Sequence, residues 1–488
     1  MEKITAARAA ELSGAALVHG PAENEIGRVE RDSRCVDSSS IFIALKGPNF
    51  DGNDFVQGAY ENGCRAFLIS TDAAQEALSA YEDAAVLRAE NTHTAFYRMA
   101  ENYLAQFDLL KIAVTGSAGK TTTKEMLKCI FSSKFRTVVS PGNFNNDIGV
   151  SLTAFEVDST TEVAVFEMGM NHMDEIHLLA RIVRPDIAGI TNIGNAHIGN
   201  LGSRENIMKA KMEITDFMDG NCTLVFNMDD EMLASLDGAE TPYKKLAAGY
   251  NAEQDGLIMV VTGLSEEGIV ESSPGASGEE GISFILRYNE ENMLCYLPVP
   301  GIYNANNAAV AVGCALTAGM ELADCADTLM SLKLPENRMS NTRSGALRIL
   351  NDTYNANPEA MKAAIDVLAS TYGKRRVAVL ADMGELGAES ERCHREVGEY
   401  AVKRKIDVLA AVGTDAAWMA DAAEKAGGDS IRVCHYKDHE EFEEHAAEIM
   451  EAEDVVLVKG SHSTHMDSVV NYLKKLGTEL DGKEQENE

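Results

Sequence analysis

Paired cysteines, long apolar runs and a signal-peptide pattern are all missing from this chain of 488 residues. The nine cysteines are scattered without a Cys-x-x-Cys pair, which indicates reduced core thiols rather than a disulfide framework or a zinc site. No apolar run approaches the ~18–20 residues that cross a bilayer, and residues 1–5 lack the layout of a signal peptide. We therefore expect a cytoplasmic protein that does not insert into membranes.

Positive charge is also in short supply. Lys and Arg number 43 against 77 Asp and Glu, which gives a formal net charge of −34. Such a surface repels a nucleic-acid backbone, so neither DNA nor RNA is an expected partner. A small anionic ligand needs a locally positive site, which draws attention to Lys120, Arg338 and Lys459. The acidic tail 481–488 is expected to be disordered.

Strand-like and helix-like segments alternate along the chain and predict an α/β protein of three domains. Residues 1–84 would form a small α/β N-terminal domain, and residues 85–333 a central P-loop domain with a doubly wound parallel sheet. Residues 334–488 would form a C-terminal Rossmann-like domain with the acidic tail. A polar segment at 264–283 is expected to be an exposed loop. No coiled-coil or strongly apolar surface pattern is present, so a monomer is the default expectation.

The specific strands and helices follow from apolar runs and helical spacing. In the central domain, strands are predicted at 111–115, 162–167, 187–191 and 223–226. In the C-terminal domain, strands are predicted at 376–381, 406–412, 430–434 and 454–458, with helices at about 389–404, 414–426, 438–450 and 465–476.

The stretch 112–123 is the most informative motif, and its sequence is IAVTGSAGKTTT. An apolar strand leads into a glycine-bearing loop, and Gly119-Lys120-Thr121 then opens a helical pattern. Backbone N–H groups in such a loop cradle phosphate, the lysine reaches the outer phosphates, and the next hydroxyl is the expected Mg²⁺ ligand. Val114 stands where the strict P-loop pattern has its first glycine, and a turn that uses glycine for geometry alone is the alternative. The motif favours a nucleoside triphosphate site.

Two later strands end in side chains that suit the same site. An apolar strand leads to Glu167, and a carboxylate at the carboxyl end of a strand beside a P-loop is a typical ligand of a metal or its water. The strand that ends near Thr191 leads to His197. A lone histidine is more often a structural hydrogen-bonding group, but the order of loop, Glu and His favours a place at the same sheet edge.

Lys211 lies on the apolar stripe of a helix predicted over 204–218, for which Ser203 is a good N-cap. The other positions of that stripe are Ile207, Ala210, Ile214 and Met218. A bare ammonium group on a buried stripe is costly, so the lysine must be paired, neutral or modified. Two interpretations fit the pattern about equally well. One is an ion pair to a nearby acid or to Glu167, and the other is a carbamate, which turns the cation into a metal-binding carboxylate.

Three further polar clusters are candidates for ligand binding. Asn304 and Asn307 share a helical face and could hydrogen-bond a purine edge, although caps and turns use asparagine more often. Residues 350–358 form a dense polar loop after an apolar strand. Lys459-Gly460-Ser461 follows another strand and fits anion binding, with a surface lysine as the alternative.

Together, these motifs resemble the Mur ligase family over essentially the whole chain. The shared pattern is matched by TGSAGKTT at 115–122, FEMG at 166–169, TNIG at 191–194 with His197, Lys211, GIYNANN at 301–307, NRM at 337–339 and KGS at 459–461. Segments 142–149, 352–358 and 380–387 are similar to those of the family member that adds D-alanyl-D-alanine. Asp32-Ser33-Arg34 with Asp51-Gly52 is similar to the domain that binds the UDP-sugar.

The resemblance implies a role for each matched residue. Lys120, Lys211 and His197 would be catalytic, and Thr121, Glu167, His197 and Lys211 would ligate two Mg²⁺ ions, with Lys211 as a CO₂-derived carbamate (N6-carboxylysine). The ATP-binding residues would be Thr115, Gly116, Ser117, Ala118, Gly119, Lys120, Thr121, Thr122, Asn304, Asn307, Arg338 and Asp352. The substrate-binding residues would be Ser33, Arg34, Asn145, Asn146, Asn355, Asn357 and Lys459.

The implied activity is ATP-dependent amide ligation through an acyl phosphate. D-Ala-D-Ala would be joined to UDP-N-acetylmuramoyl-tripeptide (UDP-MurNAc-tripeptide) to give UDP-MurNAc-pentapeptide, ADP and phosphate for peptidoglycan synthesis, and hence for cell shape and division. The chain departs from the family pattern at four positions, none of them a phosphate or metal group. These are Tyr303 for histidine, His462 for arginine, Asp467 for glutamate and Ser151 for proline.

Three alternatives are less consistent with the sequence. A family member that adds a diamino acid or a folate glutamate does not account for the Asn-rich segments 143–146 and 352–358. A GTPase switch would need an Asn-Lys-x-Asp guanine motif, and neither such a switch nor a P-loop kinase uses an amine acceptor. An inactive scaffold would have no reason to retain Lys120, Glu167, His197 and Lys211 together.

Overall fold

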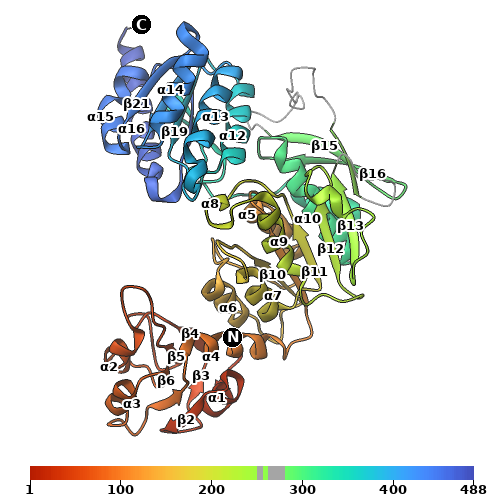
Figure 1. Cartoon of the computed structure of the whole chain (residues 1–488), viewed down its shortest axis with the longest axis vertical. Helices are drawn as coiled ribbons and strands as arrows, with labels where there is room; N and C mark the ends of the chain where they lie inside the picture. Colours follow the sequence, from red (N-terminus) through yellow and green to blue (C-terminus); the bar gives the residue numbers. More distant parts are fainter. Residues whose placement is uncertain (250–256, 262–280, 488) are drawn as a thin grey trace.

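The computed structural model describes residues 1–249, 257–261 and 281–487, and these form three α/β units. The units follow one another along an elongated molecule, with the N-terminal unit at one end and the C-terminal unit at the other (Figure 1). The loop predicted at 264–283 lies largely outside the described residues, and its last residues open β15. No helix in the described part of the chain is long and apolar enough to cross a membrane.

The first unit has a five-stranded sheet in the order β2-β7-β6-β5-β4 and a separate two-stranded ladder of β1 and β3. Because β7 pairs with both β6 and β2, the sheet extends past the boundary that we expected at residue 84. The strands are β1 (Ile4–Thr5), β2 (Ala16–His19), β3 (Glu25–Ile26), β4 (Arg28–Glu30), β5 (Ser40–Ile43), β6 (Ala66–Ile69) and β7 (Ala85–Arg88). The helices are α1 (Ala6–Ser13), α2 (Val56–Glu61) and α3 (Asp72–Leu78).

The central unit has a nine-stranded sheet in the order β16-β15-β14-β13-β12-β11-β8-β10-β9. The strands from β9 to β14 are parallel, as predicted, whereas β15 and β16 form an antiparallel hairpin at one edge. The parallel strands are β8 (Leu110–Thr115), β9 (Thr137–Val139), β10 (Val163–Glu167), β11 (Ile187–Ile190), β12 (Thr223–Asn227), β13 (Lys244–Gly249) and β14 (Leu257–Val261). The hairpin consists of β15 (Ile282–Tyr288) and β16 (Glu291–Leu297).

Helices cover both faces of this sheet, because its strands alternate buried side chains between two cores. On β8, Ile112 and Val114 pack with α5, α10 and α11, while Ala113 packs with α4, α6, α7 and α9. The helices are α4 (Thr92–Leu104), α5 (Lys120–Ser132), α6 (Asp147–Phe155), α7 (Glu175–Val183), α8 (Ile198–Leu201), α9 (Arg204–Met212), α10 (Tyr303–Thr317) and α11 (Leu322–Leu329). The core on the α4 side continues into the first unit without a break.

The helix predicted over 204–218 is shorter than expected. It ends as α9 at Met212 and tightens into a 3-10 turn over Glu213–Thr215. The Glu213 carboxylate accepts hydrogen bonds from the backbone N–H groups of Asp174 (2.8 Å) and His177 (3.0 Å) at the start of α7. These bonds tie the Glu213 side chain to the start of α7 at the point where the α-helix tightens.

The third unit has a six-stranded sheet in the order β17-β18-β22-β19-β20-β21. Only β17 is antiparallel, and the other strands form the Rossmann-like parallel sheet that was predicted. The strands are β17 (Ser340–Ser344), β18 (Leu347–Asn351), β19 (Arg375–Ala381), β20 (Val408–Val412), β21 (Arg432–Tyr436) and β22 (Asp454–Lys459). The helices are α12 (Pro358–Ser370), α13 (Ser390–Lys403), α14 (Ala416–Gly427), α15 (His439–Ile449) and α16 (Met466–Asn487).

The expectation of a disordered tail at 481–488 is wrong for most of that segment. Helix α16 runs to Asn487. The tail is rich in Lys, Glu and Gln, which have high helix propensity, and they extend a helix whose earlier turns are buried against the sheet.

Candidate active site

A cavity of about 650 Å³ lies between the central and third units, at the carboxyl ends of β8, β10 and β11. Ligands bind at this edge in open α/β sheets. Most of the site residues predicted from the sequence line this one cavity. They are Ser117, Ala118, Gly119, Lys120, Thr121, Thr122, Asn145, Asn146, Glu167, His197, Asn304, Asn307, Arg338, Asp352, Asn355, Asn357 and Lys459.

Five predicted residues do not line the cavity. Thr115 ends β8, and Gly116 begins the loop behind the cavity wall. Lys211 is buried in α9, with 1% of its surface exposed. Ser33 and Arg34 belong to the first unit, at the opposite end of the central unit from the third unit (Figure 1), and Arg34 pairs there with Asp32.

The phosphate-loop motif is braced by the segment that follows β11. The Asn192 side chain accepts a hydrogen bond from Ala118 N–H (2.9 Å) and donates one to Ala118 C=O (3.0 Å). The Asn192 carbonyl accepts from Ser117 N–H (3.0 Å). The sequence marks this TNIG segment only as part of a family pattern, and its bracing role becomes visible through the pairing of β8 with β11.

Gly119 caps α5 in a left-handed conformation, with φ at +83°. A Cβ atom at this position would lie 2.2 Å from Asn307 Oδ1 on α10. Asn307 donates in turn to Asn304 Oδ1 (3.2 Å), and Asn304 donates to Pro300 C=O (2.7 Å). The two asparagines predicted to meet a purine are therefore packed directly against the phosphate loop.

Gly119→Ala is expected to weaken ADP binding at least about tenfold, because it adds both a left-handed backbone strain of ~1–2 kcal/mol and a clash with Asn307. Gly319→Ala is the matched control, since Gly319, just beyond the far end of α10, has φ at +85° but no atom within 4 Å of the place that an added Cβ would occupy. Calorimetric titration with ADP measures both variants. Equal affinities would show that the close approach of Asn307 does not matter for nucleotide binding.

Glu167 lies at the end of β10, between an amide and a buried cation. Its Oε1 accepts a hydrogen bond from Asn145 Nδ2 (2.9 Å). Its Oε2 is 3.7 Å from Lys124 Nζ and is buried without a hydrogen-bond partner among the described residues. Lys124 is fully buried and donates to Gly142 C=O (2.8 Å). Lys124 was not among the predicted site residues, although it lies one helical turn after Lys120 and therefore on the same face of α5.

Lys120, Lys211 and His197 lie close enough for their charges to act on one another. Burial lowers the pKa of Lys120, which donates to Gly116 C=O at 2.8 Å. Burial and then the charge of Lys120 hold the pKa of Lys211 well below its ordinary value. Burial also lowers the pKa of His197, although Glu385 opposes this from 2.5 Å away in the third unit. Glu385 lies in the segment 380–387 that the sequence singled out, but no role was predicted for it, because its partner His197 is far away along the chain.

The residues predicted to hold Mg²⁺ fall into two pairs, and only the pair of His197 and Lys211 would need a modified lysine to supply a carboxylate ligand. No three His, Cys, Asp or Glu side chains gather into a metal site in the parts of the chain that the structure describes. The unpartnered Oε2 of Glu167 and the hydroxyl of Thr121 nevertheless supply oxygen ligands, which Mg²⁺ prefers. No ion pair is recorded for buried Lys211 in the described part of the chain, and the neutral amine that its lowered pKa favours is the form that reacts with CO₂.

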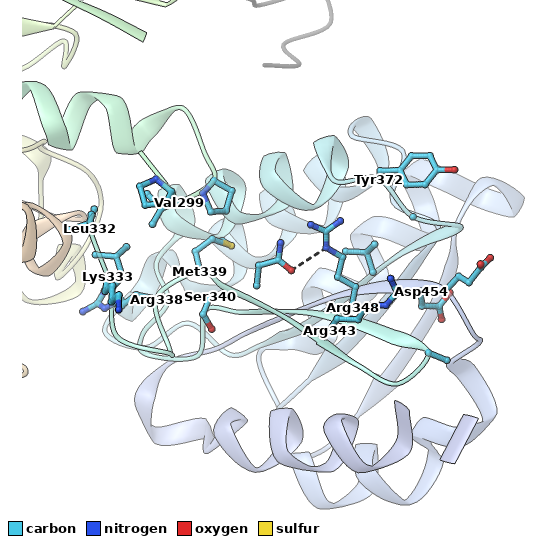
Figure 2. Close-up of a pocket in the computed structure, with 18 of the residues that line it drawn as sticks. Val299, Leu332, Lys333, Arg338, Met339, Ser340, Arg343, Arg348, Tyr372 and Asp454 are labelled. Atoms are coloured by element: carbon cyan, nitrogen blue, oxygen red, sulfur yellow. Dashed lines mark hydrogen bonds between the residues drawn. The ribbon is translucent and has the colours of Figure 1, made fainter. Parts of the chain in front are cut away.

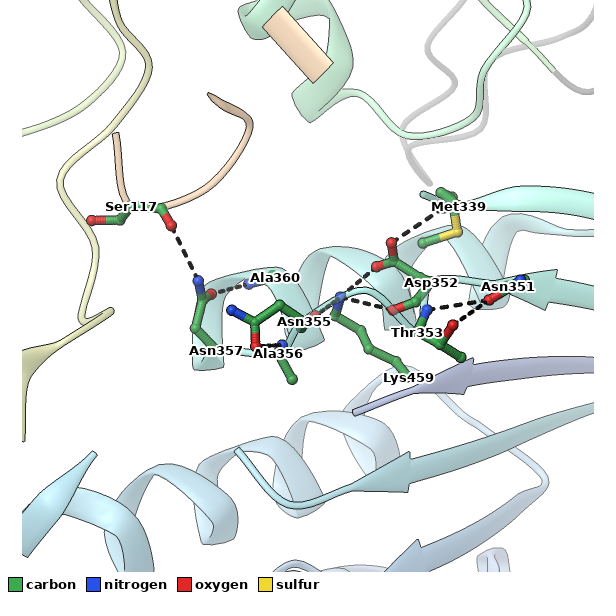
Figure 3. Close-up of polar contacts among 10 residues, drawn as sticks. All are labelled: Ser117, Met339, Asn351, Asp352, Thr353, Asn355, Ala356, Asn357, Ala360 and Lys459. Carbon is green, nitrogen blue, oxygen red and sulfur yellow. Dashed lines mark hydrogen bonds and ion pairs between the residues drawn. The ribbon is translucent and has the colours of Figure 1, made fainter. Parts of the chain in front are cut away.

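The third unit contributes a polar loop that is tied together internally (Figure 3). Lys459 at the end of β22 is buried, and its ammonium group contacts Asp352 Oδ2 (2.5 Å) and Asn355 C=O (2.8 Å). Asn357 caps α12 and donates to Ser117 C=O across the cavity (3.4 Å). In this arrangement, Lys459 organises the loop that faces the phosphate-loop motif.

Arg338 reaches from the segment before β17 to the phosphate-loop helix. Its guanidinium donates to Thr121 Oγ1 (2.9 Å) and lies over the Tyr354 ring, 3.5 Å from the centroid. This places a cation beside Lys120, as the low positive charge of the chain requires for an anionic ligand. Tyr354 is a further cavity residue to which sequence reasoning gave no role of its own.

The four departures from the family pattern occupy different environments. Tyr303 lines the cavity at the first position of α10 and packs against the core of the third unit. His462 and Asp467 are exposed, near the start of α16. Ser151 is buried in α6, and its hydroxyl has no hydrogen-bond partner among the described residues.

A second cavity, of about 1020 Å³, lies on the other side of Arg338 and Met339, along β17 and β18 (Figure 2). Lys333, Arg343 and Arg348 give it positive charge. None of the phosphate-loop residues, Glu167 or His197 lines it, so it is not a candidate for the phosphoryl chemistry.

Three family models match successive parts of the chain. They are "Mur ligase family, catalytic domain" over residues 25–104, "Mur ligase middle domain" over 114–315 and "Mur ligase, glutamate ligase domain" over 337–462. The UDP-N-acetylmuramoyl-tripeptide–D-alanyl-D-alanine ligase of Bacillus subtilis (strain 168) is 34% identical over 97% of this chain and 99% of its own length. The ligase of that name from Escherichia coli (strain K12) is 31% identical over 96% of each chain.

Solved structures of MurF ligases are also similar to this chain over nearly its whole length. A crystal structure of MurF from Acinetobacter baumannii superposes with a TM-score of 0.85 at 30% identity, covering 97% of this chain and 99% of that one. The MurF ligase from Thermotoga maritima in complex with ADP superposes with a TM-score of 0.77 at 26% identity, covering 93% of this chain and 98% of that one. The similarity therefore extends across all three units.

Proposed function

The chain belongs to the Mur ligase family, and we propose that it joins D-alanyl-D-alanine to UDP-MurNAc-tripeptide in a reaction coupled to ATP cleavage. The observation that carries this proposal is the end-to-end similarity to ligases of that name, at 34% identity over 97% of the chain. The cavity supports it, because it joins a phosphate-loop motif to the Asn-rich segments at 143–146 and 352–358.

The reaction proceeds in two displacements. The terminal carboxylate of the tripeptide attacks the γ-phosphorus of ATP, which releases ADP and leaves an acyl phosphate. The ammonium group of D-Ala-D-Ala loses a proton, and the free amine attacks the acyl carbon. An amide bond forms, phosphate departs with the C–O bond electrons, and the nitrogen releases a second proton. Catalysis of the first step is mainly positioning and stabilisation of charge on the phosphoryl oxygens.

The residues of the chain divide this work. The loop over Gly116–Gly119 would hold the β- and γ-phosphates with its backbone N–H groups, and Lys120 would neutralise the transferring oxygens. Asn304 and Asn307 would bind the adenine side of the nucleotide, while Arg338 and Asp352 would reach it from the third unit. The residues proposed for the peptide substrates are Asn145, Asn146, Asn355, Asn357 and Lys459.

Two Mg²⁺ ions are proposed at Thr121 and Glu167 and at His197 with carbamylated Lys211. When bound, such ions screen the phosphate charge and polarise the phosphoryl group. The Glu167 oxygen without a hydrogen-bond partner supports this assignment, as does the burial of Lys211 with no ion pair recorded among the described residues.

Contacts between the units suit a site that must exclude water, since water would hydrolyse the acyl phosphate. Arg338 with Thr121, Asn357 with Ser117, and Glu385 with His197 all join the third unit to the central one. We propose that the third unit closes over bound nucleotide and opens for product release.

The remaining parts of the proposal concern the cell and the first unit. Ser33 and Arg34 would hold the UDP-sugar in the unit formed by residues from 1 to about 84, away from the phosphoryl site. The protein would act in the cytoplasm as a monomer and supply the peptidoglycan precursor on which cell shape and division depend.

Phosphate release from ATP and Mg²⁺ tests the function. The assay uses UDP-MurNAc-tripeptide with and without D-Ala-D-Ala, and mass spectrometry identifies the product. Release that requires both substrates, with a product heavier by one D-Ala-D-Ala minus water, is the expected result. Release that is indifferent to the dipeptide would contradict the proposed acceptor.

A further inference from the structure

Glu359 has one carboxylate oxygen committed and one free. It lies in the first turn of α12, where the helix dipole stabilises a carboxylate. Its Oε1 accepts hydrogen bonds from the backbone N–H (3.2 Å) and Nδ2 (2.5 Å) of Asn195 in the central unit. Its Oε2 is buried without a partner among the described residues. An unpaired buried oxygen of this kind is costly unless a ligand completes it.

The position of Glu359 relates this oxygen to the reacting groups. Glu359 lines the candidate active-site cavity from the third unit, and a Cβ atom on Gly194 would lie 3.0 Å from its Oε2. Gly194 N–H donates to the Ser117 hydroxyl of the phosphate-loop motif (2.9 Å). Gly194 therefore lies between the free oxygen of Glu359 and the loop proposed to hold the phosphates.

The other cavity carboxylates are already engaged. Asp352 contacts Lys459, and Asp230 accepts backbone N–H groups from Ile193, Met232 and Leu233. Glu167 Oε2 also lacks a hydrogen bond, but Lys124 lies 3.7 Å from it and the oxygen belongs to the proposed metal site. No ion pair is recorded for Glu359 in the described ranges, so its free oxygen suits a cation brought by a substrate.

We propose that Glu359 binds the ammonium group of the incoming D-alanyl-D-alanine. This inference rests on the proposed function, because the dipeptide is the substrate that brings a cation to the site. A charge-assisted hydrogen bond from the ammonium group would satisfy Oε2 and place the amine on the third-unit side of the acyl phosphate. The bond to Asn195 holds the carboxylate in position only when the two units are docked, so the binding site for the amine is completed by domain closure.

Steady-state kinetics of Glu359→Gln tests this proposal. The amide oxygen can still accept from Asn195, while the group facing the ligand loses its negative charge. The KM for D-Ala-D-Ala is expected to rise about ten- to a hundredfold, as for loss of a hydrogen bond to a charged group. The KM for ATP and the half-saturating Mg²⁺ concentration should stay within about twofold of wild type. Glu359→Asp keeps the charge on a shorter side chain, so its KM for D-Ala-D-Ala should lie between those of the wild type and Glu359→Gln.

Two control variants separate the outcomes. Glu399→Gln makes the same change at an exposed position of α13 and should leave every constant unchanged. Asn195→Ala removes the side-chain docking bond and leaves the bond from the backbone N–H. If Glu359→Gln only reproduces the effects of Asn195→Ala on all constants, Glu359 is a docking residue and the proposal is overturned. A raised Mg²⁺ requirement with an unchanged dipeptide KM would make Glu359 a metal ligand instead. A wild-type protein that ignores D-Ala-D-Ala would refute the proposed function itself.

Discussion

Lys211→Ala is expected to reduce turnover about a hundred- to a thousandfold, the range seen when a group that stabilises transition-state charge is removed. Lys211 is 1% exposed, no ion pair is recorded for it among the described residues, and burial pushes its pKa well below the ordinary value. Of the two interpretations that the sequence left open, an ion pair to Glu167 is not what the structure contains, since Glu167 lies against Lys124 and Asn145. A carbamate at Lys211 would remove the buried cation and supply a carboxylate ligand.

The carbamate has two independent readouts. Addition of acetate or formate should restore part of the turnover of Lys211→Ala, because a small carboxylate can occupy the space that the side chain leaves. In addition, ¹³C-labelled bicarbonate should give a carbamate resonance in the NMR spectrum of the wild-type protein and none in that of the variant. Lys209→Ala, on a different face of the same helix, is the matched control. Full activity of Lys211→Ala would exclude a role in metal binding.

Lys120→Ala is expected to lower kcat about a thousandfold or more, because the ammonium group would stabilise the charge that builds on the transferring phosphoryl oxygens. In the structure, the Lys120 ammonium group donates a hydrogen bond to Gly116 C=O at 2.8 Å. A bound phosphate would compete with this carbonyl for the ammonium group. Its pKa is lowered by burial, and a bound polyphosphate would restore the charged form. Phosphate release under saturating substrates measures the loss.

The variant should still fold and still bind the peptide substrates. Lys128→Ala serves as the control, since Lys128 is on the same helix but exposed and pairs only with Glu125 among the described residues. Circular dichroism and the melting temperature establish that both variants are folded. A loss of ATP affinity with an unchanged kcat would instead assign Lys120 to ground-state binding.

Local sequence patterns predicted where the strands lie along the chain better than they predicted which strands pair with one another. The strands around Val114, Phe166 and Val225 were predicted within a residue or two, because apolar runs between turn signals identify buried parallel strands. The same patterns do not say which sheet a strand joins, so neither the pairing of β7 with the first sheet nor the antiparallel β15–β16 hairpin was anticipated. The predicted helix 204–218 ends early at Met212, and Glu213 just after it bonds to the start of α7, a contact that helical spacing does not encode.

In the candidate site, too, local motifs were predicted from the sequence, whereas contacts between distant residues were not. Motifs at strand ends brought Lys120, Glu167 and His197 to one edge, since the carboxyl ends of parallel strands meet there. The contacts that complete the cavity join residues more than a hundred positions apart, such as Asn195 with Glu359 and His197 with Glu385. No periodicity or spacing encodes such pairs, and they become visible only when the third unit is docked.

The continuous core between the first and central units has a consequence for how the molecule melts. These two units share one apolar cluster, whereas the main clusters of the third unit contain buried residues of that unit alone, with Ile198 and Tyr303 only partly buried against them. Heating should therefore produce two heat-absorption peaks, one for the first and central units together and one for the third. A nucleotide held between Thr121 and Arg338 would couple the unfolding of the third unit to that of the other two. The difference between the two melting temperatures should then become smaller.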